Sequence, residues 1–125
     1  MMQPVSTKPV YSPTVSKISF EAPGDIVDDA AYTKFLQLIG KTIKLNLQND
    51  LLLVDDIPVN KKAKADIQIT ANGAVNSVKI TYSSGSRTVD DTILKVINDT
   101  LSYMKPPKHG IIAKPVVITL CLDLN

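Results

Sequence analysis

The chain has 125 residues and a mass of 13.6 kDa, the size of one ordinary domain built around a single hydrophobic core. A hydrophobic fraction of 44% and a charged fraction of 21% are typical of a folded globular protein and exclude a disordered or fibrous chain. Lys plus Arg number 14 and Asp plus Glu number 12, so the net charge of +2 is too small to favour binding to nucleic acid.

Cysteine content and apolar runs exclude several further classes. Cys121 is the only cysteine, so an internal disulfide and a multi-cysteine zinc site are impossible. No run of about eighteen apolar residues is present, and the first ten residues lack the apolar segment of a secretory signal. The Ser-Ser-Gly-Ser turn around Gly85 lacks the ending of a phosphate-binding loop. We expect no cofactor and no metal.

The first 24 residues are predicted to be a Pro-rich tail or linker. Four prolines are spread among Ser, Thr and Val, and no apolar side chains recur at a spacing of 3.6 residues. The folded domain is therefore expected to comprise residues 25–125.

A first helix is predicted from Asp28 to about Asn49. Its apolar residues lie three or four positions apart, which gathers them on one helical face, and they are Tyr32, Phe35, Leu36, Ile39 and Ile43. The carboxylates of Asp28 and Asp29 are suited to capping its first turn. The segment from Leu51 to Pro58 is too short for a further helix and is interpreted as a packed connector.

Residues 63–82 predict a β-hairpin. Apolar and polar residues alternate from Ala63 to Ala71, and the dipeptide Asn72-Gly73 then fits a type I′ turn between two strands. A two-residue loop would place Ile67 opposite Val78, Ala65 opposite Ile80, and Asp66 opposite Lys79. Asn76 would then lie on the apolar face, and either a β-bulge or fraying of the hairpin end could relieve this conflict.

A second helix and a third strand complete the predicted domain. Thr88 and Asp91 resemble a capping box, and Pro106-Pro107 ends the helix. Its apolar stripe is Val89, Ile93, Val96, Ile97, Leu101 and Met104. After a turn at Lys108 to Gly110, the alternation from Pro115 to Leu124 predicts the third strand.

These elements predict an α+β fold with the order α-β-β-α-β and a three-stranded antiparallel sheet, order 2-1-3, packed on two helices. The second and third strands are then the sheet edges. Lys79 lies in the middle of the second strand, where its charge disfavours pairing with another chain, whereas the third strand has no charge before Asp123. An uncharged edge can recruit a partner strand. The predicted partner-binding residues are Val116, Val117, Ile118, Thr119, Leu120, Cys121 and Leu122.

The sequence gives little support for a catalytic site. His109 is the only histidine and lies in a Lys-Gly loop, where a surface side chain is the simpler interpretation. Three pairs of adjacent aspartates lack the alternating spacing of a calcium loop and are better explained as caps and turns. The chain is therefore expected not to be an enzyme, and a small hydrolase or transferase is only a remote alternative.

Several motifs together resemble the TonB C-terminal domain family. They are the segment ITANGAVNSVKITYSSGSRTVDD from Ile69 to Asp91, MKPPK from Met104 to Lys108, and the final PVVITLCLDL. The resemblance implies the periplasmic, protein-binding end of an inner-membrane energy transducer, which holds an extended segment of an outer-membrane receptor beside its last strand. On this reading the chain is either an excised piece without its membrane anchor or a free-standing relative.

The resemblance leaves alternatives for the partner and the binding surface. One is a TolA-like or other envelope scaffold that binds a protein through a different surface. The exposed last strand could also pair with its own copy, so a homodimer is a further possibility.

Overall fold

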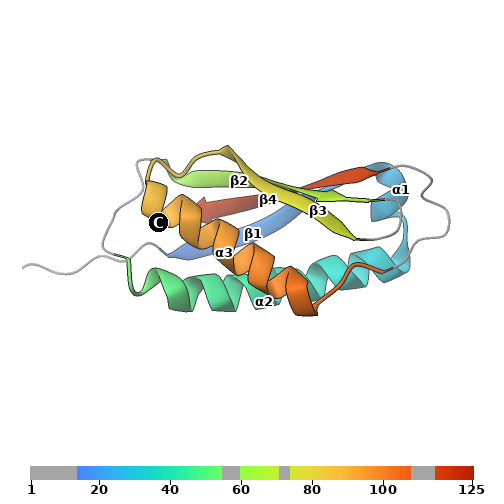
Figure 1. Cartoon of the computed structure of the whole chain (residues 1–125), viewed down its shortest axis with the longest axis horizontal. Coiled ribbons are helices and arrows are strands. Elements are labelled where there is room, and N and C mark those ends of the chain that lie inside the picture. The colour runs from blue at the N-terminus through green and yellow to red at the C-terminus, as the bar shows by residue number, and fades with distance from the viewer. Residues whose placement is uncertain (1–13, 55–59, 71–73, 108–114) are drawn as a thin grey trace, which may run out of the picture.

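The computed structural model describes residues 14–54, 60–70, 74–107 and 115–125 (Figure 1). Their elements, in chain order, are β1 (Val15–Glu21), α1 (Gly24–Val27), α2 (Ala30–Leu51), β2 (Lys62–Ile69), β3 (Val75–Tyr82), α3 (Arg87–Tyr103) and β4 (Val116–Leu124).

The four strands form one antiparallel sheet with the order β1-β4-β2-β3. Helices α2 and α3 lie together along one face of this sheet (Figure 1). The α+β class is thus confirmed, and the three predicted strands have the predicted relative order. The expected three-stranded sheet is wrong, however, because β1 adds a fourth strand beside β4.

Strand β1 lies within the segment predicted to be a tail or linker. It pairs with β4 from Val15, opposite Leu124, to Glu21, opposite Thr119. Immediately before it, the backbone groups of Thr14 and Asn125 exchange two hydrogen bonds, with N···O distances of 3.1 and 2.9 Å. The linker expectation therefore fails for residues 15–21, because their backbone hydrogen bonds are satisfied within the sheet.

A β-bulge concealed this strand in the sequence. The register shifts between Val15 and Lys17, so Ser16 is an extra residue in β1. The bulge places the inward-facing Val15 and Ile18 three positions apart instead of two. Only Ile18 and Phe20 keep the period of two, and two residues are too few to predict a strand.

The predicted hairpin register is confirmed. Ile67 pairs with Val78, Ala65 with Ile80, and Asp66 with Lys79. Between Gln68 and Ile69 the register shifts, because Ile69 pairs with Val75 and Asn76 is extra. This bulge relieves the conflict at Asn76, whose side chain is exposed. The predicted Asn72-Gly73 turn lies outside the described residues.

The two predicted helices are confirmed with small shifts at their ends. α2 starts after Asp29, whose carboxylate accepts a hydrogen bond of 2.9 Å from the Tyr32 N–H. The N-cap of α3 lies two residues before its predicted position at Thr88, because the hydroxyl of Ser86 accepts the hydrogen bond from the Val89 N–H. The short helix α1 had no signal in the sequence pattern.

The core lies between the sheet and the two helices. Alternate side chains of β2 and β4 are buried against α2 and α3, and the intervening ones are only partly covered on the other face. The largest fully buried side chains include Ile39, Ile43 and Leu47 of α2 and Ile93 and Ile97 of α3. Both predicted apolar stripes thus face the core, although Leu36 and Met104 are only partly buried.

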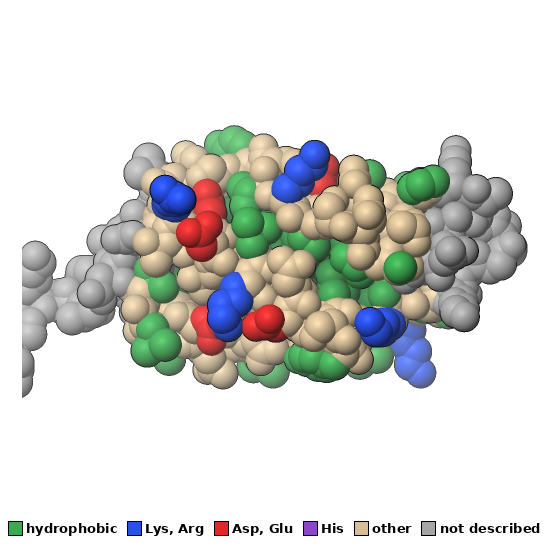
Figure 2. Space-filling model, in the orientation of Figure 1, with side chains coloured by type: hydrophobic (Ala, Val, Ile, Leu, Met, Phe, Trp, Pro, Cys, Tyr) green, Lys and Arg blue, Asp and Glu red, His purple; other side chains and the backbone are tan. Residues whose placement is uncertain are grey.

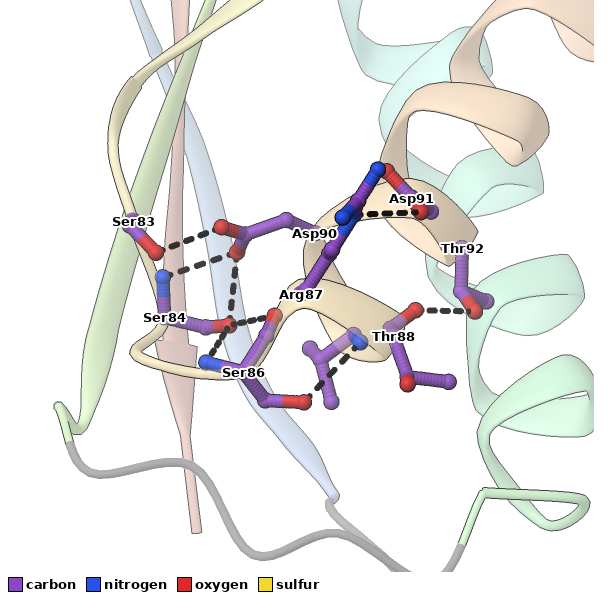
Figure 3. Close-up of polar contacts among 9 residues, drawn as sticks. Ser83, Ser84, Ser86, Arg87, Thr88, Asp90, Asp91 and Thr92 are labelled. Carbon is purple, nitrogen blue, oxygen red and sulfur yellow. Dashed lines mark hydrogen bonds and ion pairs between the residues drawn. The ribbon is translucent and has the colours of Figure 1, made fainter.

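A polar cluster joins the end of β3 to the start of α3 (Figure 3). The Asp90 carboxylate accepts hydrogen bonds from the Ser84 N–H at 2.9 Å, the Ser84 hydroxyl at 2.6 Å and the Ser83 hydroxyl at 2.5 Å. Ser84 is completely buried. The Ser84 hydroxyl in turn accepts a hydrogen bond from the Ser86 N–H, so one carboxylate organises the whole turn.

Replacing Asp90 with Ala should destabilise the fold by about 1–3 kcal/mol, because the buried donors of Ser84 lose their acceptor. The matched control is Asp91→Ala in the same helical turn. Asp91 makes only an exposed contact of 4.0 Å with Arg87, so its loss should cost at most about 0.5 kcal/mol. Urea unfolding followed by circular dichroism measures both variants, and equal losses would contradict the role assigned to Asp90.

Candidate functional site

The seven residues predicted to bind a partner all lie in β4, and their side chains alternate between two environments. Val116, Ile118, Leu120 and Leu122 are buried against the helices. The intervening side chains lie on the opposite face of the sheet and are partly or largely exposed, and these are Val117, Thr119 and Cys121. A partner can therefore reach only the second set without opening the core.

β4 is an interior strand of the sheet, and only at Val116 to Ile118 does β1 provide no partner for it. β2 pairs with one edge from Val116 to Asp123, and β1 pairs with the other from Thr119 to Leu124. The expectation that the last strand is an open sheet edge is therefore wrong in this fold. The physical reason is β1, which covers the hydrogen-bonding groups that the sequence alone left unpaired.

The side chains of β1 are less buried than those of β2 and β4. Of its seven residues only Val15 is buried, whereas β2 and β4 bury every second side chain. Ile18 and Phe20 are partly buried against the core. The start of the strand has extra contacts, since the Val15 N–H donates to Gln48 Oε1 of α2 at 3.0 Å and the Ser16 hydroxyl donates to the Asp123 carbonyl at 3.1 Å.

Cys121 lies at the junction of β1 and β4. It pairs directly with Ser19, and Glu21 is close enough to interact with its thiol. Burial raises the pKa of the Cys121 thiol above its ordinary value, and the neighbouring Glu21 carboxylate raises it further. The thiol is thus kept protonated at neutral pH, which is the opposite of what a nucleophilic cysteine requires.

A groove of about 510 Å³ runs between β1 and α2. Its apolar lining includes Ile18 and Phe20 of β1 and Leu36 of α2. Gly40 of α2 lies beside Phe20, and a Cβ atom added there would come within 3.2 Å of the Phe20 ring. The absence of a side chain at this position allows β1 to approach the helix closely.

Three lysines also line this groove, namely Lys17 from β1 and Lys41 and Lys44 from α2. Sequence reasoning missed this feature because it did not identify β1. The period-two pair Ile18 and Phe20 was the available signal for the strand. Figure 2 shows one face of the molecule, on which charged side chains of both signs are interspersed.

The other candidate residues have structural roles or lie outside the described residues. His109, Asp55 and Asp56 are in the second category. Asp29 caps α2, and Asp90 holds the turn before α3. Within the described parts of the chain, no cluster of three potential metal ligands occurs.

Most of the chain matches a known protein family. The family described as "TonB C terminal" matches residues 32–120, a span from α2 into β4 that covers more than half of the chain. No curated protein and no solved structure matched the chain. Among the helices that the structure describes, none is both long and apolar enough to span a membrane. On the extent of the family match, the chain belongs to the TonB C-terminal family.

Proposed function

We propose that this chain is the periplasmic protein-binding domain of a TonB-like energy transducer, and that an extended segment of an outer-membrane receptor pairs with β4 in place of β1. Membership of the TonB C-terminal family supports the general role, because the family comprises interaction domains of energy transducers and not enzymes. The observation that carries the proposal is the pairing of β4 with a weakly buried strand.

Strand exchange would conserve most of the interactions that β1 makes. The backbone bonds of a β-ladder do not depend on side-chain identity, so a receptor strand could satisfy the same groups of Thr119 to Leu124. The side chains of β1 give it little advantage over a receptor strand in pairing with β4. Full burial of one large apolar side chain contributes about 1.5–3 kcal/mol, and Ile18 and Phe20 are each only partly buried.

The closed sheet gives the binding equilibrium two states. In the closed state β1 covers β4, and in the open state the β4 edge accepts a partner. A receptor segment that binds only the open state has its affinity reduced by the fraction of molecules in that state. Because β1 protects the apolar strand when no receptor is present, it also reduces the risk of aggregation at this edge.

The alternative function is a TolA-like or other envelope scaffold that binds its partner through a different surface. The pairing of β4 with β1 from Thr119 to Leu124 favours this alternative, since no rearrangement is then needed. The two functions differ in one respect that can be tested, because only strand exchange requires β1 to leave.

Locking β1 onto β4 should abolish receptor binding at β4. Ser19 and Cys121 are direct cross-strand partners, and such residues have Cα atoms about 4.5–5.5 Å apart, within the range of a disulfide. A Ser19→Cys variant can therefore be oxidised to join the strands. Titration with an extended receptor peptide, followed by amide shifts of residues 116–122, should show no binding when oxidised and full binding after reduction.

The matched control is the double variant Ser19→Cys, Cys121→Ser, which carries the same change in β1 but cannot form the disulfide. It should bind the receptor peptide equally well with and without oxidant. Unchanged binding by the locked protein would reject strand exchange at β4 and favour the scaffold alternative.

Weakening β1 should have the opposite effect. Phe20→Ser removes a partly buried ring from the closed state only, so the open state becomes more populated. We expect receptor affinity to rise by up to about tenfold, measured by calorimetry. Leu45→Ser is the control, because Leu45 is an exposed residue of α2. A loss of affinity in Phe20→Ser would show that β1 contributes to binding instead of competing with it.

A further inference from the structure

We propose that the outer edge of β1, together with the groove between β1 and α2, binds an extended, acidic segment of a second protein. This site differs from the β4 edge and requires the closed state, because β1 itself supplies one wall. It was not anticipated from the sequence. We infer the class of partner from three features of the site, which are an open strand edge, an apolar floor and lysines that have no ion-pair partner among the described residues.

The first component of this site is the outer backbone edge of β1. Among the described residues, β1 is the terminal strand of the sheet and pairs only with β4, so no described strand lies on its other side. The bulge at Ser16 and the bond from the Val15 N–H to Gln48 occupy the beginning of this edge. From Ile18 to Glu21 the pairing with β4 is regular. This part of β1 can therefore template an added strand.

The floor of the groove selects apolar side chains. Ile18 and Phe20 contribute one wall and Leu36 contributes the other, and Gly40 allows Phe20 to pack closely against α2. Side chains alternate along an extended segment, so every second residue of an added strand would face this floor. Residues with short or branched apolar side chains suit a shallow groove that is open on one side.

The cations select acidic residues. Lys41 and Lys44 of α2 line the groove, and no Asp or Glu is among its described lining residues. Lys17 also lines it, but Lys17 lies opposite Asp123 in the β1–β4 ladder and shares a second pocket with Asp123 and Glu21. The two ion pairs found in the described parts of the chain are Arg87 with Asp91 and Lys95 with Asp99, so they leave Lys41 and Lys44 without an ion-pair partner. Carboxylates on an incoming segment would supply the complementary charge and accelerate association.

Charge also distinguishes among possible occupants. Residues 1–13 of this chain contain Lys8 and no acidic residue, so they do not complement the groove. A second copy paired through the same edge would place two lysine-lined grooves next to each other, which is unfavourable. An acidic segment from a different protein fits both the charge and the free edge.

The test uses the oxidised Ser19→Cys protein, in which β1 is fixed on β4 and the β4 edge is closed. The probe is a blocked peptide in which Val alternates with Glu, and the control peptide has Lys in place of Glu. The acidic peptide should shift the amides of residues 18–21 and of α2 around Gly40. The basic peptide should leave these amides unmoved, and added salt should weaken acidic peptide binding.

The double variant Lys41→Glu, Lys44→Glu should reduce the affinity for the acidic peptide by about tenfold or more. Lys34→Glu is the matched control, because Lys34 is an exposed residue of the same helix that does not line the groove. It should change the affinity less than about twofold. A Lys41→Gln, Lys44→Gln variant, with an intermediate loss, separates charge from any effect of the Glu substitutions on folding.

Three outcomes would overturn this assignment. The first is that the Lys41 and Lys44 variants bind the acidic peptide as tightly as the unsubstituted protein, and the second is that the amide shifts are confined to β3. The third is that unlabelled chain alone produces the same shifts, which would make the surface a self-association site. The result is independent of the function proposed above. If the acidic peptide binds the locked protein while the receptor peptide fails to bind the reduced protein, strand exchange is wrong and the groove remains.

Discussion

The double pairing of β4 is the interaction on which the rest of the structure depends. This strand forms ladders with β1 and β2 at once, and it buries Val116, Ile118, Leu120, Leu122 and Leu124 against the helices. A strand that is paired along most of both edges and covered on one face is well shielded from water and from other chains. The accessible edges are therefore those of β1 and β3, and any partner of β4 must compete with a strand of the same chain.

The helical layer determines how easily that competition can take place. α2 lies against β1 through Gly40 and through Gln48, whereas α3 lies on the same face of the sheet against β3, the opposite edge strand. The closed state thus depends on the β1–β4 ladder and on a few contacts between β1 and α2. The core is formed mainly by β2, β4 and the two helices. From β1, Val15 belongs to this core, and Ile18 and Phe20 pack against it. Loss of β1 would leave most of the apolar packing in place.

The sequence predicted the parts of the fold in which local pattern and tertiary packing agree. The hairpin register followed from the alternation around Ile67 and Val78, and both long helices followed from their apolar stripes. The family resemblance rested on the same regular elements. These regions are consistent at several levels, which is why simple periodicity was sufficient.

The failures have one physical cause, which is local irregularity. The bulge at Ser16 disrupts the alternation that would identify β1, and without β1 the sequence predicts an open edge on β4. The α3 cap was misplaced because Ser86 and Thr88 are both good cap residues, and only the hydrogen bonds of Ser84 and Asp90 favour the earlier one. The groove could not be found at all, because it exists only when β1 and α2 are placed side by side.

The paired backbones of Thr14 and Asn125 give the domain a specific mechanical geometry. Because β1 and β4 are antiparallel, the beginning of one lies beside the end of the other. Tension applied at Thr14 while the end of β4 is held would load the ladder one rung at a time, as in unzipping, instead of shearing all its rungs together. The Val15 contact with Gln48 would be among the first to resist. A domain that transmits force could thus separate β1 under a small load while its helices and remaining strands stay folded.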